Sequence, residues 1–322
     1  MLTESQQRLF SKLHQDLGDK IISFLADKDI NEVMLNPDGS LWVDSVKDGL
    51  VEEGRISSVH AHAILNCVAG IQGVVISEQN PRLEAELPYY RELRGERFTG
   101  QIPPIVANPC FTIRKKSEMV FTLDDYYLSE RLTEEQCIVL KDLVSDRKNI
   151  LVCGGPGSGK TTFTNALISE IVRCDPSQRI IILEDTPELQ CTAPNKVSMV
   201  TSESVSMTSL VRTAMRMRGD RILVGEVRGA EALDMLKAWN TGCPGGICTV
   251  HANGCVEAIQ RISDLAVEAG LSHPPLSLIR HTIDAVVFVT KIGSQKGFVS
   301  EICAVKEINN EKFILTKLGL SE

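Results

Sequence analysis

The chain has 322 residues, of which 43% are hydrophobic and 24% charged, an ordinary composition for a globular protein large enough to form two hydrophobic cores. Its formal net charge of −8 and the lack of a long basic patch do not favour a standing nucleic-acid partner, although a local basic face could exist within an acidic total. No apolar run approaches the roughly 20 residues that span a bilayer, so we expect any membrane association to be peripheral.

The ten cysteines are scattered through apolar stretches, and the sequence shows no secretory leader. We therefore expect buried thiols in a reducing cytoplasm rather than a disulfide framework. Cys243, Cys248, His251 and Cys255 lie close together in the sequence, which raises the alternative of a zinc site. Their spacing fits no common zinc module and includes no C-x-x-C pair, so zinc is the less favoured interpretation.

The first third of the chain mixes helix and strand patterns. Apolar residues recur every four positions between residues 5 and 25, which predicts an amphipathic helix. Residues 32–35 and 41–43 flank an Asn-Pro-Asp-Gly turn and predict a hairpin. A further helix is expected at 58–71, with strands at 83–87, 97–102 and 111–114. We therefore predict an N-terminal α+β domain over residues 1–118.

After this domain the periodic pattern is lost and the sequence turns polar, so we place an interdomain linker at residues 119–133. An alternation of strands and helices follows. The strands are expected near 150–153, 180–183, 197–200, 222–224, 247–250 and 286–289. Residues 134–322 should therefore form an α/β domain with a largely parallel sheet, of the RecA-like P-loop NTPase type.

The most informative motif of this domain lies between an apolar strand pattern and a helix pattern. It fits the phosphate-loop pattern G-x-x-x-x-G-K-[ST] and reads Gly154, Gly155, Pro156, Gly157, Ser158, Gly159, Lys160, Thr161, with Thr162 next. Such a loop binds the phosphates of ATP with backbone N–H groups, a helix N-terminus and the lysine, while the Thr161 hydroxyl ligates Mg²⁺. Pro156 has no N–H, so we expect the amides from Gly157 onward to form the cradle.

Carboxylates follow two of the predicted strands. Glu184 and Asp185 come after one apolar run, and Glu226 comes after another. Since ligands of open α/β sheets bind at the carboxyl ends of the strands, these acids are candidates to organise Mg²⁺ and to orient an attacking water. The alternative is that Glu184, Asp185 and the nearby Glu188 are solvated loop charges.

His251 ends another apolar strand pattern, at 247–250. Its imidazole could sense the γ-phosphate or the water next to it. A lone histidine after a strand is more often a structural hydrogen-bonding group, and only the neighbouring motifs favour a functional role.

Taken together, these motifs resemble those of the type II/type IV secretion ATPase superfamily, most of all the TrbB branch of conjugal transfer ATPases. The resemblance rests on five segments in order: 154–162, 184–190, 221–229, 238–242 and 249–253. It extends into the first domain through 31–36, 83–88 and 109–115. The tetracysteine insert of many type II secretion ATPases is missing, which favours the conjugation branch.

The resemblance implies roles for particular residues. Lys160 and Thr161 match the Walker A pair, and Glu226 matches the Walker B glutamate that positions water. Glu184 lies in the acidic box, and His251 is the histidine-box residue. Arg97 and Arg114 fall where the family places arginines that reach the nucleotide phosphates, although both could be ordinary surface arginines. Cys243 departs from the pattern, since related chains often have histidine there.

The resemblance also implies a homo-hexameric, Mg²⁺-dependent ATPase at the cytoplasmic face of the bacterial inner membrane. It would contact inner-membrane components of a secretion or conjugation apparatus, and ATP would bind between the two domains. Three other functions stay open at this stage: a pilus-assembly or type II secretion ATPase, a nucleic-acid motor, and a non-catalytic nucleotide-gated scaffold. The acidic composition argues against stable nucleic-acid binding.

Overall fold

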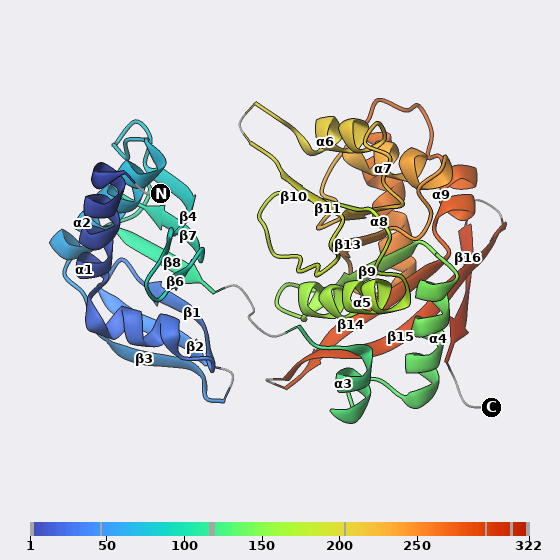
Figure 1. The fold of residues 1–322 in the computed structure, drawn as a ribbon, viewed down its shortest axis with the longest axis horizontal. Coiled ribbons are helices and arrows are strands. Elements are labelled where there is room, and N and C mark those ends of the chain that lie inside the picture. The colour runs from blue at the N-terminus through green and yellow to red at the C-terminus, as the bar shows by residue number, and fades with distance from the viewer. Residues whose placement is uncertain are drawn as a thin grey trace. The chain divides into compact units, whose positions relative to one another are not determined.

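The computed structural model describes residues 3–45, 47–115, 120–202, 204–293, 295–309 and 312–319, without the side chains of 307–309 and 312. The chain forms two compact units, Met1–Glu118 and Met119–Glu322. Figure 1 shows the elements of both units in chain order. Within the described ranges, no helix combines the length and the apolar composition needed to cross a bilayer.

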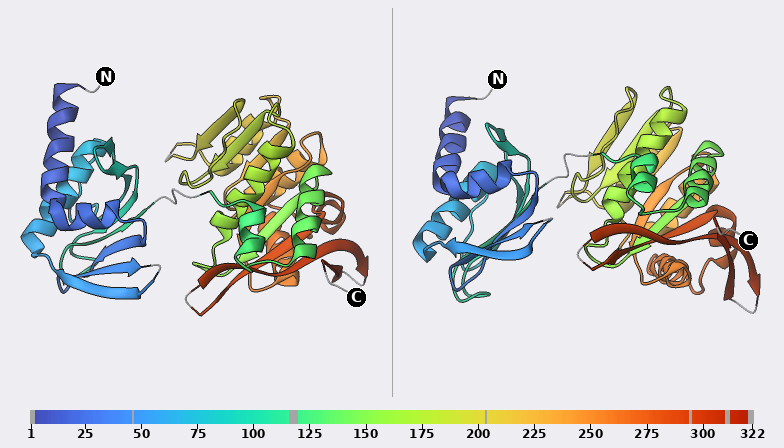
Figure 2. Two further views of the ribbon diagram at one scale, coloured as in Figure 1. Left: turned by 60° about the horizontal axis from the view of Figure 1, so that its bottom comes forward. Right: turned by 90° about the horizontal axis from the view of Figure 1, so that it is seen from below.

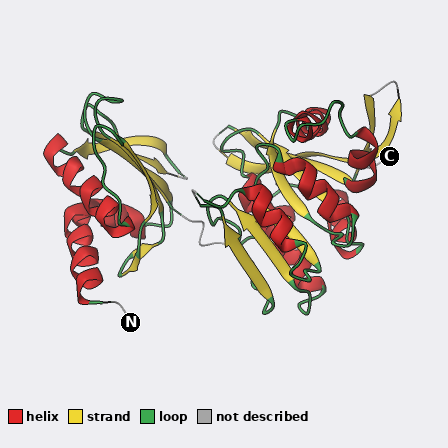
Figure 3. Cartoon of the chain, turned by 90° about the horizontal axis from the view of Figure 1, so that it is seen from above, coloured by secondary structure: helices red, strands yellow, loops and turns green. Residues whose placement is uncertain are grey.

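The first unit is an antiparallel sheet with two helices packed on one face (Figure 3). Its strands run in the order β3-β2-β1-β8-β7-β4. Their bounds are β1 Ile30–Leu35, β2 Ser40–Ser45, β3 Gly49–Arg55, β4 Arg82–Glu86, β7 Arg97–Gln101 and β8 Cys110–Arg114. The helices are α1 Glu4–Ala26 and α2 Ser58–Gln72, and a small ribbon pairs β5 Tyr89–Tyr90 with β6 Leu93–Arg94. The predicted α+β character, hairpin and helices are confirmed, whereas β3, β5 and β6 were not foreseen.

Helix α1 is bent at Gly18, which has φ 71° and ψ 164° inside an otherwise helical segment. Figure 2 shows the two parts of α1 running in different directions. Glycine adopts this backbone conformation without the Cβ clash that other residues meet. The bend keeps apolar residues of both parts buried, including Leu13 and Leu17 before it and Ile21 and Leu25 after it. The four-residue apolar spacing predicted the helix but not its bend.

The segment expected to be a linker contains a short helix, α3 Leu123–Leu128. Leu123 and Tyr126 are buried, and the Tyr126 ring lies 5.4 Å from that of Phe163. Thr122 and Asp125 cap the helix reciprocally. The linker expectation thus differs from the structure over 120–133, because two inward-facing residues are too few to show a period in sequence. The rest of the polar run, 116–119, lies outside the described residues.

The second unit is built on an eight-stranded sheet in the order β11-β10-β12-β13-β9-β14-β15-β16. The first six strands in this order are parallel, and β15 and β16 extend the sheet antiparallel. The bounds are β9 Ile150–Gly154, β10 Ile180–Glu184, β11 Lys196–Val200, β12 Arg221–Val224, β13 Ile247–His251, β14 Ala285–Ile292, β15 Gln295–Asn309 and β16 Lys312–Leu318. All six predicted strands are present, whereas β15 and β16 were missed.

Helices cover both faces of this sheet (Figure 3). One face packs against α3, α4 Glu134–Ser145 and α5 Lys160–Cys174. The other packs against α6 Met207–Ala214, α7 Glu231–Asn240, α8 Cys255–Val267 and α9 Leu276–Thr282. Central strands are buried on both sides, which explains their continuous apolar sequences, such as Ile180–Leu183. The predicted fold class, a P-loop α/β domain with a smaller N-terminal α+β domain, is confirmed.

Close packing in the first unit gives a test of its core. A Cβ added to Gly100 of β7 would lie 2.0 Å from Leu65 Cδ2 and 2.9 Å from the Phe98 ring. We expect Gly100→Ala to lower the free energy of unfolding of this unit by about 1–3 kcal/mol, because the core must shift to admit a methyl group. Gly70→Ala is the matched control, since Gly70 is an exposed position of α2 with no heavy atom within 4 Å of an added Cβ. Chemical denaturation should show the control unchanged or stabilised by about 0.5–1 kcal/mol, and equal midpoints for the two variants would contradict this packing.

Candidate active site

The phosphate loop connects the end of β9 to the start of α5, as the sequence predicts. A Cβ on Gly154 would lie 2.2 Å from the Val289 carbonyl oxygen and 2.5 Å from Ser158 Oγ, so the fold leaves no room for a side chain there. Gly159 precedes the first helical residue with φ 95°, a conformation that glycine adopts without strain. The loop N–H groups and the N-terminus of α5 thus lie at the same edge of the sheet.

The loop is braced from outside the motif. The Gly297 N–H of β15 donates to the Ser158 carbonyl oxygen at 2.8 Å. The Ser158 side chain is buried, and its Oγ has no hydrogen-bond partner. A buried hydroxyl without a partner is uncommon, and this one lies in a loop suited to bind an oxyanion.

Three further strands end at this edge. In the order β10-β12-β13-β9, β13 lies between the phosphate-loop strand and β12, and His251 is in register with Gly154. Glu226 follows the end of β12, and Glu184 ends β10. The parallel sheet therefore brings together side chains from four distant segments of sequence at the carboxyl ends of its strands. This is where open α/β sheets bind their ligands.

Lys160 is buried, and its ammonium group contacts polar atoms of the phosphate loop and of His251. Its Nζ donates to the carbonyl oxygens of Gly154 at 2.9 Å and Gly155 at 3.0 Å. It also lies 3.2 Å from Nδ1 of His251. An ammonium group only donates, so Nδ1 of His251 accepts this bond, which places the proton of a neutral imidazole on Nε2.

That Nε2 atom lies 3.0 Å from Oε1 of Glu226. The angle does not make a hydrogen bond, and Oε1 is buried without a hydrogen-bond partner. The second oxygen, Oε2, accepts a bond from Arg228 at 2.7 Å, and this bond is the main reason that the pKa of Arg228 lies above its ordinary value. The contacts run from Lys160 through His251 to Glu226, with Arg228 at the end, and leave one carboxylate oxygen able to accept a further bond.

The acidic residues after β10 have separate surroundings. Glu184 is buried, and its Oε1 accepts the backbone N–H groups of Glu188 at 2.8 Å and Leu189 at 2.7 Å. The Thr161 hydroxyl donates to Oε2 of Glu188 at 3.2 Å. Asp185 accepts a bond from the Thr201 hydroxyl at 3.0 Å and lies 3.9 Å from Arg228. Glu184, one of the expected Mg²⁺ ligands, thus holds the segment that follows β10 in place. This segment brings Glu188 to Thr161.

The other motif residues have plainer settings. Thr162 is the third residue of α5 and is half-buried, while Pro156 and Gly157 are exposed in the loop. The sequence also offers three cysteines, together with His251, as zinc ligands: Cys243, Cys248 and Cys255. Their thiols donate hydrogen bonds to three different backbone carbonyl oxygens, those of Gly219, Thr249 and Val286 respectively.

Arg97 and Arg114 belong to the first unit, where they lie directly opposite each other on β7 and β8. Both lie on the face opposite to buried Phe98 and Ile113, and Arg114 Nε is 3.4 Å from Oε1 of Glu32. Two guanidinium groups on one sheet face can bind an anion, and the Glu32 carboxylate of the same sheet already contacts Arg114.

Three contributors to this site were not assigned from the sequence: Glu188, Arg228 and Gly297. The first two lie inside segments that carry the family resemblance, 184–190 and 221–229, and their position there is the signal that could identify them. Gly297 belongs to no motif, and only the folding of β15 past the loop reveals it.

Comparison with known proteins is consistent with this geometry. The chain is 41% identical over 319 residues to a probable conjugal transfer protein TrbB of Sinorhizobium fredii, covering 99% of this chain and 96% of that protein. It is 33% identical over 293 residues to the type IV secretion system protein VirB11 of Bartonella henselae, with 78% and 80% covered.

Among solved structures, the pilus retraction motor PilT with bound ADP is similar with a TM-score of 0.61 and 18% identity, covering 92% of this chain and 81% of that one. The Legionella pneumophila ATPase DotB has a TM-score of 0.60 at 16% identity, with 94% and 80% covered. At such identities the likeness shows the fold alone. The profile of the type II/IV secretion system protein family matches residues 77–312. The predicted resemblance is confirmed, and the chain belongs to the type II/IV secretion system protein family.

Proposed function

We propose that this chain is an Mg²⁺-dependent ATPase that works as a hexameric motor of a type IV secretion or conjugal transfer apparatus. Family membership implies an NTPase, and the TrbB relative, aligned over nearly the whole chain, favours the conjugation branch. The observation that carries the proposal is the series of contacts from Lys160 through His251 to Glu226. It connects the phosphate loop to a carboxylate that has one unbonded oxygen.

The loop fits a triphosphate. Its N–H groups from Gly157 onward, the N-terminus of α5 and the unpartnered Ser158 hydroxyl all suit an oxyanion. Lys160 holds the loop carbonyls of Gly154 and Gly155 in this structure, so it must exchange these contacts for phosphate oxygens when ATP binds. That exchange also releases Nδ1 of His251.

The Thr161 hydroxyl and the Glu188 carboxylate supply hard oxygen donors at 3.2 Å from each other, a donor set suited to Mg²⁺. Mg²⁺ bound there would neutralise negative charge on the β- and γ-phosphates. Glu184 holds the segment that contains Glu188 by accepting a backbone hydrogen bond from it. Asp185 contacts Arg228 at 3.9 Å instead. We assign Glu184 to positioning and Thr161 with Glu188 to the metal.

Glu226 is placed to orient and deprotonate the attacking water. Its Oε1 accepts the water proton, while Arg228 holds Oε2 and the imidazole of His251 lies against Oε1. Arg97 and Arg114 are assigned to the transferring phosphate, where two guanidinium groups would offset the charge that develops. The hexamer would lie at the cytoplasmic face of the bacterial inner membrane, bound peripherally to membrane components of the apparatus.

Replacing Glu226 by Gln tests the chemistry. We expect kcat to fall by about 10²–10³-fold, equivalent to about 3–4 kcal/mol, because the amide orients water poorly and accepts no proton. ATP affinity should stay within a few fold, since Glu226 does not touch the loop. Phosphate release and calorimetric ATP binding measure the two effects. Lys160→Ala is the comparison variant and should lose both binding and turnover, whereas full activity of the Glu226→Gln protein would exclude the proposed base.

The positioning role of Glu184 is testable through stability. We expect Glu184→Ala to lower the free energy of unfolding by about 2–3 kcal/mol, because two backbone N–H groups lose a charged acceptor. Glu184→Gln keeps a carbonyl oxygen and should recover most of this loss. Asp185→Asn is the matched control at the next position, where the side chain is 41% exposed, and it should change stability by less than about 0.5 kcal/mol. Equal losses for Glu184→Ala and Asp185→Asn in denaturant titrations would argue against the assignment.

Assembly is tested by light scattering coupled to size exclusion. We expect a mass six times that of the 35.4 kDa chain when ATP and Mg²⁺ are present. The Glu226→Gln variant should stay assembled longest, because it binds ATP without consuming it. A monomer mass under conditions of full phosphate release would contradict the hexamer and leave the ATPase assignment intact.

A further inference from the structure

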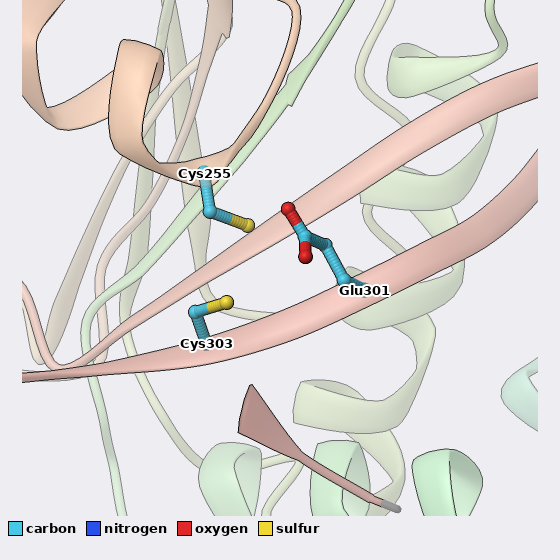
Figure 4. A group of neighbouring side chains, drawn as sticks. All are labelled: Cys255, Glu301 and Cys303. Carbon is cyan, nitrogen blue, oxygen red and sulfur yellow. The ribbon is translucent and has the colours of Figure 1, made fainter. Parts of the chain in front are cut away.

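Three side chains with metal-ligating atoms meet away from the phosphate loop. The thiols of Cys255 and Cys303 and a carboxylate oxygen of Glu301 all lie within 4.8 Å of one another. Figure 4 shows the three side chains pointing toward a common space between the start of α8 and β15. Glu301 and Cys303 are two residues apart on β15, so both project from the same face of that strand.

A third thiol borders this group. Cys153 is fully buried at the end of β9, and its Sγ donates to the Gly254 carbonyl at 3.5 Å, next to the first residue of α8. A hydrogen bond with the Cys153 thiol is the largest cause of the raised pKa of Cys255. Cys153, Cys255 and Cys303 also belong to one buried cluster on the α8 face of the sheet. The donor set within this spacing is therefore two sulfurs and one oxygen, contributed by α8 and β15, and the Cys153 thiol lies beside it.

The oxygen donor of the group comes from Glu301, which is half-buried beside the two thiols. Lys317 contacts Oε2 of Glu301 at 3.1 Å and leaves Oε1 for another partner. Cys255 is the first residue of α8, so a metal ion bound to its thiol would lie at the start of that helix.

We propose that Cys255, Cys303 and Glu301 bind a thiophilic divalent cation, represented by Zn²⁺, with a fourth coordination position open to water. Tetrahedral zinc takes sulfur ligands at about 2.3 Å and carboxylate oxygens at about 2.0–2.2 Å, so ligand atoms of one site lie roughly 3.5–3.8 Å apart. Small side-chain rotations would close the group from its present spacing to this one. A disulfide between Cys255 and Cys303 gives the neighbouring carboxylate no role, whereas a metal ion would take it as a ligand.

Occupancy of this site would join segments that lead to the nucleotide. Cys153 directly precedes the phosphate loop, and Cys255 follows the segment that begins with His251. A bound ion would fix the start of α8 to β15, the strand whose Gly297 braces Ser158. The site is distinct from the oxygen ligands assigned to Mg²⁺, and the proposal does not depend on ATP hydrolysis.

Cobalt titration of the full chain tests the proposal. The protein is stripped with a chelator under reducing conditions and titrated with Co²⁺ without nucleotide. Thiolate ligands give a sulfur-to-cobalt charge-transfer absorption in the near ultraviolet, and tetrahedral coordination gives strong visible bands. We expect one Co²⁺ per chain with both signals, and displacement of Co²⁺ by Zn²⁺.

Matched variants locate the ion. Cys303→Ser should lower the charge-transfer absorption, because it removes one thiolate ligand, and Glu301→Gln should weaken binding at least tenfold while leaving the thiols in place. Cys174→Ser is the control, because Cys174 is an exposed cysteine of α5 outside the group. Circular dichroism and thermal melting establish whether each variant is folded. If Cys303→Ser does not fold, Glu301→Gln still tests the site.

Two results would overturn the proposal. One is wild-type protein whose cobalt spectrum equals that of folded Glu301→Gln or Cys303→Ser. The other is a Cys255–Cys303 disulfide, found by peptide mapping in protein purified without reductant, together with no cobalt–sulfur band after reduction.

Discussion

The position of β13 between β9 and β12 is the constraint on which the active site depends. Parallel pairing on both sides of β13 sets His251 level with Gly154 and one strand away from the end of β12. Neighbouring strands lie about 4.8 Å apart, so a ring at the end of β13 can contact the lysine of the phosphate loop with one nitrogen and a carboxylate after β12 with the other. Without that strand order the motif residues would be present but apart.

This arrangement also explains the state of the polar groups at the site. Lys160 is fully engaged by protein atoms, whereas Ser158 Oγ and Glu226 Oε1 are buried without hydrogen bonds. A folded chain normally satisfies such groups, so the combination describes a site whose partners come from outside. Nucleotide and water would satisfy these atoms in exchange for the contacts of the lysine with its own loop.

Much of the fold was predictable because it follows local rules. Continuous apolar runs predicted the parallel strands, and the four-residue spacing predicted α1. What failed depends on tertiary context. The bend at Gly18, the two buried residues of α3 and the antiparallel strands β15 and β16 carry no strong period in the sequence. The phosphate loop, Glu226 and His251 were found by motif, while Glu188 was recognised only as a loop charge, since its meeting with Thr161 depends on how Glu184 folds the segment between them.

The bond between the Gly297 N–H and the Ser158 carbonyl has a mechanical meaning. Ser158 is part of a loop that must rearrange around an incoming ligand, and Gly297 lies near the start of a strand fifteen residues long. Either the bond breaks when the loop moves, exposing a backbone donor, or the strand moves with it. Movement of the phosphate loop is therefore coupled to the position of the antiparallel strands β15 and β16. The rate of amide hydrogen exchange in these strands should depend on whether a ligand occupies the loop.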